Sequence, residues 1–185
     1  MSTLTSIPLT TLSGSPATLA DYSGKVLLIV NVASKCGLTP QYTALEQLYQ
    51  QFKAKGLVVL GFPANDFAAQ EPGTDQEIAK FCTSDYPVTF PLFSKISVKG
   101  PGIHPLYKEL ISAAPTHVVN DDGFRDGITG YLKSHSLPSP DAAPAVLWNF
   151  EKFLVGRDGT VLNRFAPDMP PNDPRITAAI EEALA

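Results

Sequence analysis

The chain has 185 residues, of which 44% are hydrophobic and 17% charged, with a formal net charge of −4. This composition suits one soluble globular domain over residues 1–185, and the acidic balance argues against a nucleic-acid partner. No apolar run approaches the roughly 20 residues that cross a bilayer, which argues against a membrane span. The first residues carry no secretory signal pattern, so we expect a cytoplasmic location.

The first part of the chain predicts a hairpin followed by a strand–helix–strand unit. Residues 6–18 contain two short apolar stretches around a turn. Residues 25–32 form a nearly continuous apolar run, which is typical of a strand buried on both faces. Apolar residues recur at helical spacing over 40–55, Gly56 ends that pattern, and a second buried strand is predicted over 57–62. This order predicts a parallel, right-handed crossover.

The middle of the chain predicts two helices and one strand. Thr74 and Glu77 form a capping-box pattern that opens a helix running through Cys82. A strand is predicted over 90–96, and a further helix over 104–113.

The last part of the chain contains an unusual segment, polar and rich in proline and serine, over residues 115–144. Its helical pattern is weak, so we expect a loop insertion there. Strands over 145–155 and 160–165 flank a strong turn signal, and residues 173–174 begin a final helix with a cap residue and a proline. The whole order predicts an α/β fold of the thioredoxin-like kind. It has a mixed central sheet, helices on both faces and an N-terminal β-hairpin.

The two cysteines of the chain, Cys36 and Cys82, are the first candidates for chemistry. In a reducing compartment such cysteines are more often catalytic or redox-sensing than structural, although two inert buried thiols would give the same count. Cys36 follows the carboxyl end of the first long strand and precedes a helix, where reactive groups of α/β sheets gather and the helix dipole favours thiolate. Residues 37–39 contain no second cysteine, which argues against simple dithiol exchange.

Cys36 needs more than a helix dipole to become a nucleophile at neutral pH. An unperturbed thiol with a pKa of about 8.5 is only about 3% ionised at pH 7, and making it mostly thiolate takes roughly 2.7 kcal/mol. A helix terminus contributes about 0.3–1 kcal/mol, whereas each hydrogen bond to a charged acceptor contributes about 1.5–3 kcal/mol. We therefore expect one or two further donors near the sulfur.

Three sequence blocks indicate a family. They are NVASKCGLT at 31–39, FPANDFAAQEPG at 62–73 and WNFEKFLVG at 148–156. Together, in this order and at these separations, they closely resemble the glutathione peroxidase family in its bacterial, cysteine-containing branch. The resemblance extends from about residue 6 to residue 184.

The resemblance implies a mechanism and the residues that perform it. In that family a cysteine attacks hydrogen peroxide or an organic hydroperoxide, and this cysteine matches Cys36. Water or an alcohol leaves, and the cysteine becomes a sulfenic acid. The donor side chains of the family match Gln70, Trp148 and Asn149. The resemblance implies no cofactor and no metal.

The resemblance also assigns a role to Cys82, which matches the resolving cysteine of the thioredoxin-dependent branch. It would form a disulfide with Cys36, which thioredoxin would then reduce. A disulfide needs Cα atoms about 4.4–6.8 Å apart, and the family is known for movement of this helix. We therefore expect the helix carrying Cys82 to unwind or shift during turnover.

Several positions depart from the family pattern. Asp66 replaces a glutamine, and its carboxylate is expected to point away from the sulfur, because a nearby carboxylate would raise a thiol pKa. Lys35 is expected to be solvated. Glutathione-using members carry several arginines around the site, whereas only Arg164 is basic in the matching stretch, so glutathione is a less favoured reductant than thioredoxin. Residues 115–144 fall where tetrameric members carry an extra loop, which leaves monomer and dimer both open.

Two alternative functions remain at this point. A peroxide sensor would form the same disulfide and pass it to a partner protein. A metal-binding module would combine the cysteines with His104, His117 and His135, although no pair of these residues has the spacing of zinc ligands.

Overall fold

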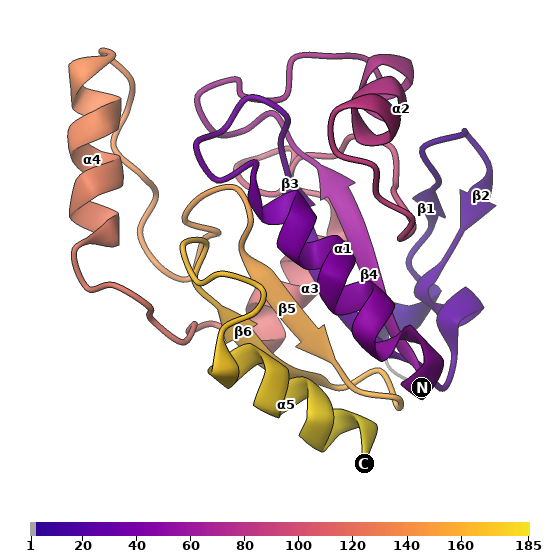
Figure 1. Ribbon diagram of the computed structural model, residues 1–185. Helices are drawn as coiled ribbons and strands as arrows, with labels where there is room; N and C mark the ends of the chain where they lie inside the picture. The colour runs from indigo at the N-terminus through magenta and orange to yellow at the C-terminus, as the bar shows by residue number, and fades with distance from the viewer. Residues whose placement is uncertain (1–2) are drawn as a thin grey trace.

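A mixed, four-stranded sheet forms the centre of the computed structural model, which describes residues 3–185 (Figure 1). Its strands lie in the order β4-β3-β5-β6. Their bounds are Val26–Val32 for β3, Leu57–Pro63 for β4, Lys152–Val155 for β5 and Val161–Phe165 for β6. β4 is parallel to β3, whereas β5 is antiparallel to both β3 and β6. A separate antiparallel hairpin joins β1 (Leu9–Thr10) to β2 (Pro16–Ala17), so the predicted fold class is confirmed.

Helices cover both faces of this sheet, as Figure 1 shows. α1 (Gln41–Phe52) and α5 (Pro174–Leu184) lie on one face, and α3 (Pro105–Ala113) lies on the other. α2 (Asp75–Ser84) lies beyond the upper ends of β3 and β4, and α4 (Phe124–Ser134) stands apart at one side. The described residues also form three short 3-10 helices, at Thr3–Ser6, Leu19–Tyr22 and Lys53–Lys55.

Local sequence signals explain where these elements begin and end. All seven residues of β3 are buried, as expected for a strand covered on both faces. Gly56 ends the α1 region in the left-handed conformation, with φ of 108°. At the start of α2 the predicted capping box is present, because Glu77 N donates to Thr74 Oγ1 over 3.2 Å and Thr74 N donates to the Glu77 carboxylate over 2.8 Å.

The prediction of a strand over residues 90–96 is wrong, because the structure forms no strand there. Only isolated bridges form there, from Leu92 to Gly61 and from Phe93 to Thr11. The hydrogen bonds of this segment are divided between β4 and the N-terminal hairpin, and Pro91 has no N–H to continue a ladder. The segment therefore crosses from one sheet to the other without joining either.

The segment 115–144 is not simply a loop, because it contains α4. Gly127 and Gly130 lie inside this helix and weaken its sequence pattern, while Ile128 and Leu132 supply the buried face that stabilises it. The strand predicted from residue 145 begins only at Lys152, since residues 146–150 form a buried loop in which Phe150 has a φ of 68°.

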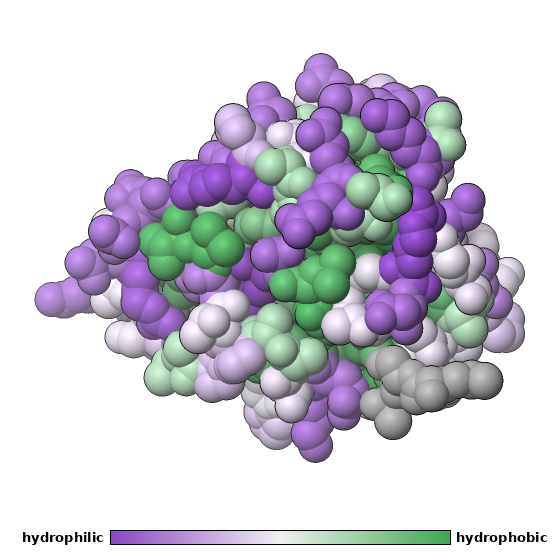
Figure 2. Space-filling model, turned by 90° about the horizontal axis from the view of Figure 1, so that it is seen from below, coloured by the Kyte–Doolittle hydropathy of each residue, from purple (hydrophilic) through white to green (hydrophobic). Residues whose placement is uncertain are grey.

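The surface is mixed in character. Seen from below (Figure 2), hydrophilic side chains cover much of the molecule and separate several smaller hydrophobic patches. Across residues 3–185, no helix combines the length and the apolar character that crossing a bilayer requires.

Candidate active site

Three loops meet at the carboxyl ends of β3 and β4. Because β5 runs antiparallel to β3, with Lys152 opposite Val30, the loop that leads into β5 reaches this same edge. Lys35 N donates to the Gln70 backbone oxygen over 3.0 Å, which joins the loop after β3 to the loop after β4. Asn31 Nδ2 donates to the Trp148 backbone oxygen over 3.1 Å, which adds the third loop.

Cys36 lies in the first of these loops, with 9% of its surface exposed. The Leu38 backbone N–H donates to its sulfur over 3.3 Å. Thr39 Oγ1 fixes the turn, because it accepts from Cys36 N over 3.0 Å and donates to the Ala33 oxygen over 2.8 Å. The thiol is thus held just before α1 with one backbone donor directed at it. Thr39 and Leu38 were not identified from the sequence.

Gln70 and Asn149, 79 positions apart in the chain, are joined side chain to side chain. Asn149 Nδ2 donates to Gln70 Oε1 over 3.0 Å, and Asn149 is fully buried. With its carbonyl oxygen engaged, the Gln70 amide keeps its N–H donors for another acceptor. Two of the three predicted donor residues, Gln70 and Asn149, are therefore connected beside the cysteine loop.

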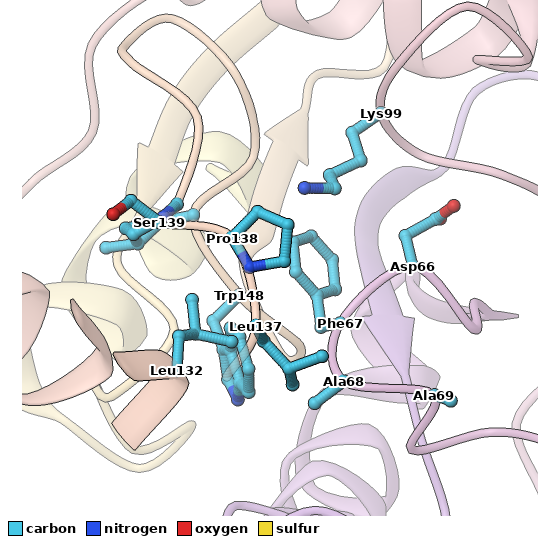
Figure 3. A pocket seen from close by; sticks show the side chains of 12 residues that line it. Asp66, Phe67, Ala68, Ala69, Lys99, Leu132, Leu137, Pro138, Ser139 and Trp148 are labelled. Atoms are coloured by element: carbon cyan, nitrogen blue, oxygen red, sulfur yellow. The ribbon is translucent and has the colours of Figure 1, made fainter. Parts of the chain in front are cut away.

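Trp148 forms the adjoining wall of the site and has only 4% of its surface exposed. Its ring packs on Phe67 with centroids 5.4 Å apart, and it meets Tyr131 of α4 edge-on at 6.0 Å. In Figure 3 its indole nitrogen is directed away from Lys99 and Pro138, and the Trp148 side chain lines a pocket.

A buried ion pair that the sequence did not reveal supports the Trp148 loop. Glu151, fully buried, accepts from Leu147 N over 2.8 Å and from the Arg164 guanidinium. Arg164 also donates to the backbone oxygens of Ala114, Pro144 and Ala145. Since Arg164 is 2% exposed and already committed to these acceptors, it cannot also bind the carboxylates of a glutathione molecule.

Cys82 lies on the buried face of α2 with 1% of its surface exposed. Burial raises the pKa of its thiol to about 11, and the nearby Glu71 charge adds to this shift. The Tyr42 hydroxyl lies close enough to affect the Cys82 pKa, although it makes no well-formed hydrogen bond within the described part of the chain. Both cysteines are free thiols, and Cys82 is not accessible while α2 is folded.

Glu71, next to Gln70, is a second buried acid that the sequence did not single out. One of its oxygens accepts from the Ser34 hydroxyl, while the other has no partner among residues 3–185. Burial raises the pKa of this carboxyl group. Glu71 thus links the loop that carries Cys36 to the region beneath α2.

The sequence places two charged residues, Asp66 and Lys35, near the thiol, and the structure shows the surroundings of each. Asp66 accepts from Ser97 Oγ and from Val98 N, each over 2.7 Å, and Figure 3 shows its carboxylate directed away from Trp148. Lys35 is exposed to solvent, as expected.

The three histidines occupy separate places. His104 caps α3 by accepting from Leu106 N, His117 lies 3.6 Å from Glu151, and His135 bonds the Tyr131 oxygen at the end of α4. Within residues 3–185 no three His, Cys, Asp or Glu side chains gather in a way that could hold a metal ion.

The fold and the site define a class of protein, a thioredoxin-fold enzyme with a free thiol at the edge of the sheet. Comparisons agree with this class. The glutathione peroxidase family model matches residues 4–111. The thioredoxin/glutathione peroxidase BtuE of Escherichia coli is 52% identical over 175 residues, covering 94% of this chain and 93% of that protein. The hydroperoxy fatty acid reductase gpx1 of Synechocystis is 46% identical, covering 94% and 90%.

Solved structures give the same result. The apo crystal structure of Trgpx superposes with a TM-score of 0.70 at 35% identity, covering 100% of this chain and 97% of that one. A thiol:disulfide interchange protein from Chlorobium tepidum shares the fold alone, with a TM-score of 0.57 at 19% identity and coverage of 97% and 93%. The chain belongs to the glutathione peroxidase family, among its bacterial members. It is a thiol peroxidase that acts on a peroxide substrate and draws electrons from a thiol reductant.

Proposed function

We propose that Cys36 reduces hydrogen peroxide and organic hydroperoxides with Gln70, Asn149 and Trp148 as donors. The Cys36 sulfur attacks one peroxide oxygen, the O–O bond breaks, and the departing oxygen takes a proton and leaves as water or an alcohol. Cys36 is thereby oxidised by two electrons to a sulfenic acid. The hydrogen bond of 3.0 Å between Asn149 and Gln70 carries this proposal, because it orients amide donors beside the cysteine loop.

Cys82 would complete the cycle as the resolving cysteine. Its thiol attacks the Cys36 sulfenic acid, water leaves, and a Cys36–Cys82 disulfide forms. Because Cys82 is buried on α2, this step requires α2 to unwind or shift.

Thioredoxin is the reductant we propose for this disulfide. Its dithiol exchanges with the Cys36–Cys82 bond and leaves both cysteines reduced. The burial of Arg164 supports this choice over glutathione, and the E. coli relative is named for both reductants. We further place the reaction in the cytoplasm, where thioredoxin systems keep thiols reduced. The name of the Synechocystis relative supports long-chain hydroperoxides as substrates beside hydrogen peroxide.

The test is NADPH-coupled peroxide reduction, run separately with thioredoxin plus its reductase and with glutathione plus its reductase. Wild type should turn over rapidly with thioredoxin, Cys82→Ser should lose this turnover, and Cys36→Ser should be inactive with both systems. Turnover with glutathione that survives Cys82→Ser would refute both the reductant and the role of Cys82. A single turnover without recycling by either system would instead favour a peroxide sensor.

A further inference from the structure

A buried carboxyl group lies between the loop that carries Cys36 and the helix that carries Cys82. Glu71 is fully buried, and one of its oxygens accepts from the hydroxyl of Ser34, two residues before Cys36. The other oxygen, Oε2, is buried and has no hydrogen-bond partner among residues 3–185. A buried polar atom without a partner costs free energy, so this oxygen requires an explanation beyond packing.

A crevice connects Glu71 to the turn of α2 that carries Cys82. Its volume is about 550 Å³. It is lined by residues from both segments, among them Ser34, Lys35 and Glu71 from the loops and Ile78 and Phe81 from α2. Ile78 and Cys82 are four residues apart and lie on the same buried face of the helix. The crevice therefore lies between the residues directly before Cys36 and the turn that must move when Cys82 approaches it.

Three ionisable groups gather beneath α2, the carboxyl of Glu71, the thiol of Cys82 and the hydroxyl of Tyr42. Burial raises the pKa of the thiol and of the hydroxyl, and the Glu71 charge raises each further, so the groups lie close together. Burial also raises the pKa of Glu71, whereas the hydrogen bond from Ser34 and the charges of Lys95 and Lys35 act in the opposite direction. Of the three groups, only the carboxylate can accept a proton at neutral pH.

The other acids that line the crevice are Glu77 and Asp85, and both are exposed. The Glu77 carboxylate accepts from Thr74 N over 2.8 Å, and the Asp85 carboxylate accepts from Ser84 Oγ over 2.7 Å. Of the acids at the crevice, Glu71 alone is buried, and it is also the one bonded to the cysteine loop.

We propose that Glu71 accepts the proton of the Cys82 thiol when α2 opens and returns it to the oxygen that leaves Cys36. This proposal rests on the proposed function and names the base of its resolving step. The Cys82 sulfur bonds to the Cys36 sulfur, the S–O bond of the sulfenic acid breaks, and the departing hydroxide takes the proton from Glu71 and leaves as water. Ser34 is a positioning residue, because its hydroxyl holds the carboxyl group at the cysteine loop.

A purely electrostatic role for Glu71 predicts the opposite effect of its removal. Burial and the Glu71 charge raise the pKa of Cys82, so removing the charge alone would lower this pKa and accelerate disulfide formation. Removing a general base instead slows a reaction by about 10²–10⁴-fold. Because Glu71→Gln keeps the size of the side chain, the direction of its effect distinguishes the two roles.

The test follows one round of disulfide formation. One equivalent of hydrogen peroxide is added to the reduced protein without a recycling system, and the Cys36–Cys82 disulfide is measured by acid quench, thiol alkylation and mass spectrometry. At pH 7 Glu71→Gln should form the disulfide about 10²-fold more slowly than wild type. Its rate should rise about tenfold per pH unit from pH 6.5 to pH 8, because the thiol must then ionise to solvent, whereas the wild-type rate should stay nearly constant over this range.

Two further variants separate loss of the base from altered folding. Glu71→Asp retains a carboxylate and should keep the nearly constant pH profile of wild type. Ser34→Ala should move the acidic fall of the rate to higher pH, because the hydrogen bond from Ser34 lowers the pKa of Glu71. The control is Glu181→Gln, an exposed position on α5, which should match wild type.

The outcomes distinguish this proposal from the proposed function. An equal or faster rate in Glu71→Gln, or a steep pH profile in Glu71→Asp, would overturn the assignment of Glu71 while the proposed cycle stands. An acidic fall that Ser34→Ala leaves unmoved would do the same. Absence of a Cys36–Cys82 disulfide in oxidised wild type would refute the proposed function itself.

Discussion

Asn149 is buried beside Gln70, and the hydrogen bond from its amide affects both the packing of the loops and the chemistry of the site. Structurally, its hydrogen bond to Gln70 Oε1 joins two loops that are far apart in the sequence. Chemically, the same bond decides which end of the Gln70 amide remains free to donate. A side chain that orients a donor before the reaction begins lowers the cost of stabilising the charge that develops on the departing oxygen.

Asn149→Ala should therefore slow the oxidation of Cys36 by hydrogen peroxide about 10²-fold, the usual effect of removing one oriented donor. Stopped-flow oxidation of the reduced protein, without any recycling system, measures this step directly. Asn163→Ala, on β6, is the control and should retain the wild-type rate. An Asn149→Ala rate within threefold of wild type would show that the amide pair only supports the loops.

Burial of Lys152 makes the stability of this fold depend on pH. Its ammonium group is fully buried and donates to the backbone oxygens of Pro167 and Met169, and burial lowers its pKa from 10.5 to about 7. Between pH 7 and pH 10.5, Lys152 binds a proton in the unfolded chain but not in the folded chain. The contribution of Lys152 to stability therefore rises with pH across this window and is lowest below pH 7.

The free energy of unfolding of wild type, relative to Lys152→Met, should increase from pH 7 to pH 9 by up to about 1.4 kcal/mol per pH unit. Urea unfolding at both pH values, with a thiol reductant present, provides the measurement. The comparison with Lys152→Met cancels the titration of the cysteines. A difference that stays constant with pH would show that Lys152 is charged in the folded protein at pH 7.

At the scale of one element, we expect α2 to control the second half of the proposed cycle. Burial on this helix keeps the Cys82 thiol protonated at neutral pH, because its pKa is raised to about 11. Local opening of α2 would both expose the thiol and lower its pKa toward the ordinary value. The stability of α2 should therefore set the rate of disulfide formation.

Thr74→Ala removes the cap of α2 and should destabilise it by about 1 kcal/mol. Disulfide formation should then accelerate about fivefold, while the first step, oxidation of Cys36 by peroxide, keeps its wild-type rate. The matched control is Asp173→Ala, which removes the cap of α5 and should leave both rates unchanged. Equal disulfide rates in wild type and Thr74→Ala would contradict a requirement for α2 opening.

For the whole molecule, the sheet and the Glu151–Arg164 pair together hold the third loop of the site. The antiparallel arrangement of β5 and β3 brings the loop to the same edge as Cys36. Arg164 then connects β6 to the backbone at both ends of the 115–144 segment, through Ala114, Pro144 and Ala145. Removing one partner of such a pair leaves the other charge buried without compensation.

Arg164→Met should lower the free energy of unfolding by about 3–5 kcal/mol. Arg175→Met provides the comparison, because Arg175 pairs with Asp173 at the surface and an exposed pair contributes about 0–1 kcal/mol. Urea unfolding of both variants distinguishes them. Equal losses would show that the buried pair contributes no more to stability than the exposed one.

Much of this protein follows from local sequence signals. The cap at Thr74, the glycine at position 56 and the apolar run of β3 are decided within a few residues, so the sequence predicted these elements and their order correctly. The three blocks that contain Cys36, Gln70 and Trp148 likewise identified the family without any coordinates.

Other features depend on partners that the sequence does not place side by side. Residues 90–96 have strand-like composition, but their hydrogen bonds are divided between two sheets. The sequence pattern of α4 is weak because the helix contains two glycines. The helix forms nevertheless, since Ile128 and Leu132 pack against apolar neighbours in the folded protein. The Glu151–Arg164 pair and the hydrogen bond from Ser34 to Glu71 join residues from separate segments. The sequence alone determined the family and proposed Cys36 as the reactive thiol. The tertiary structure decided which side chains surround this cysteine, because long-range burial and pairing are properties of the folded chain.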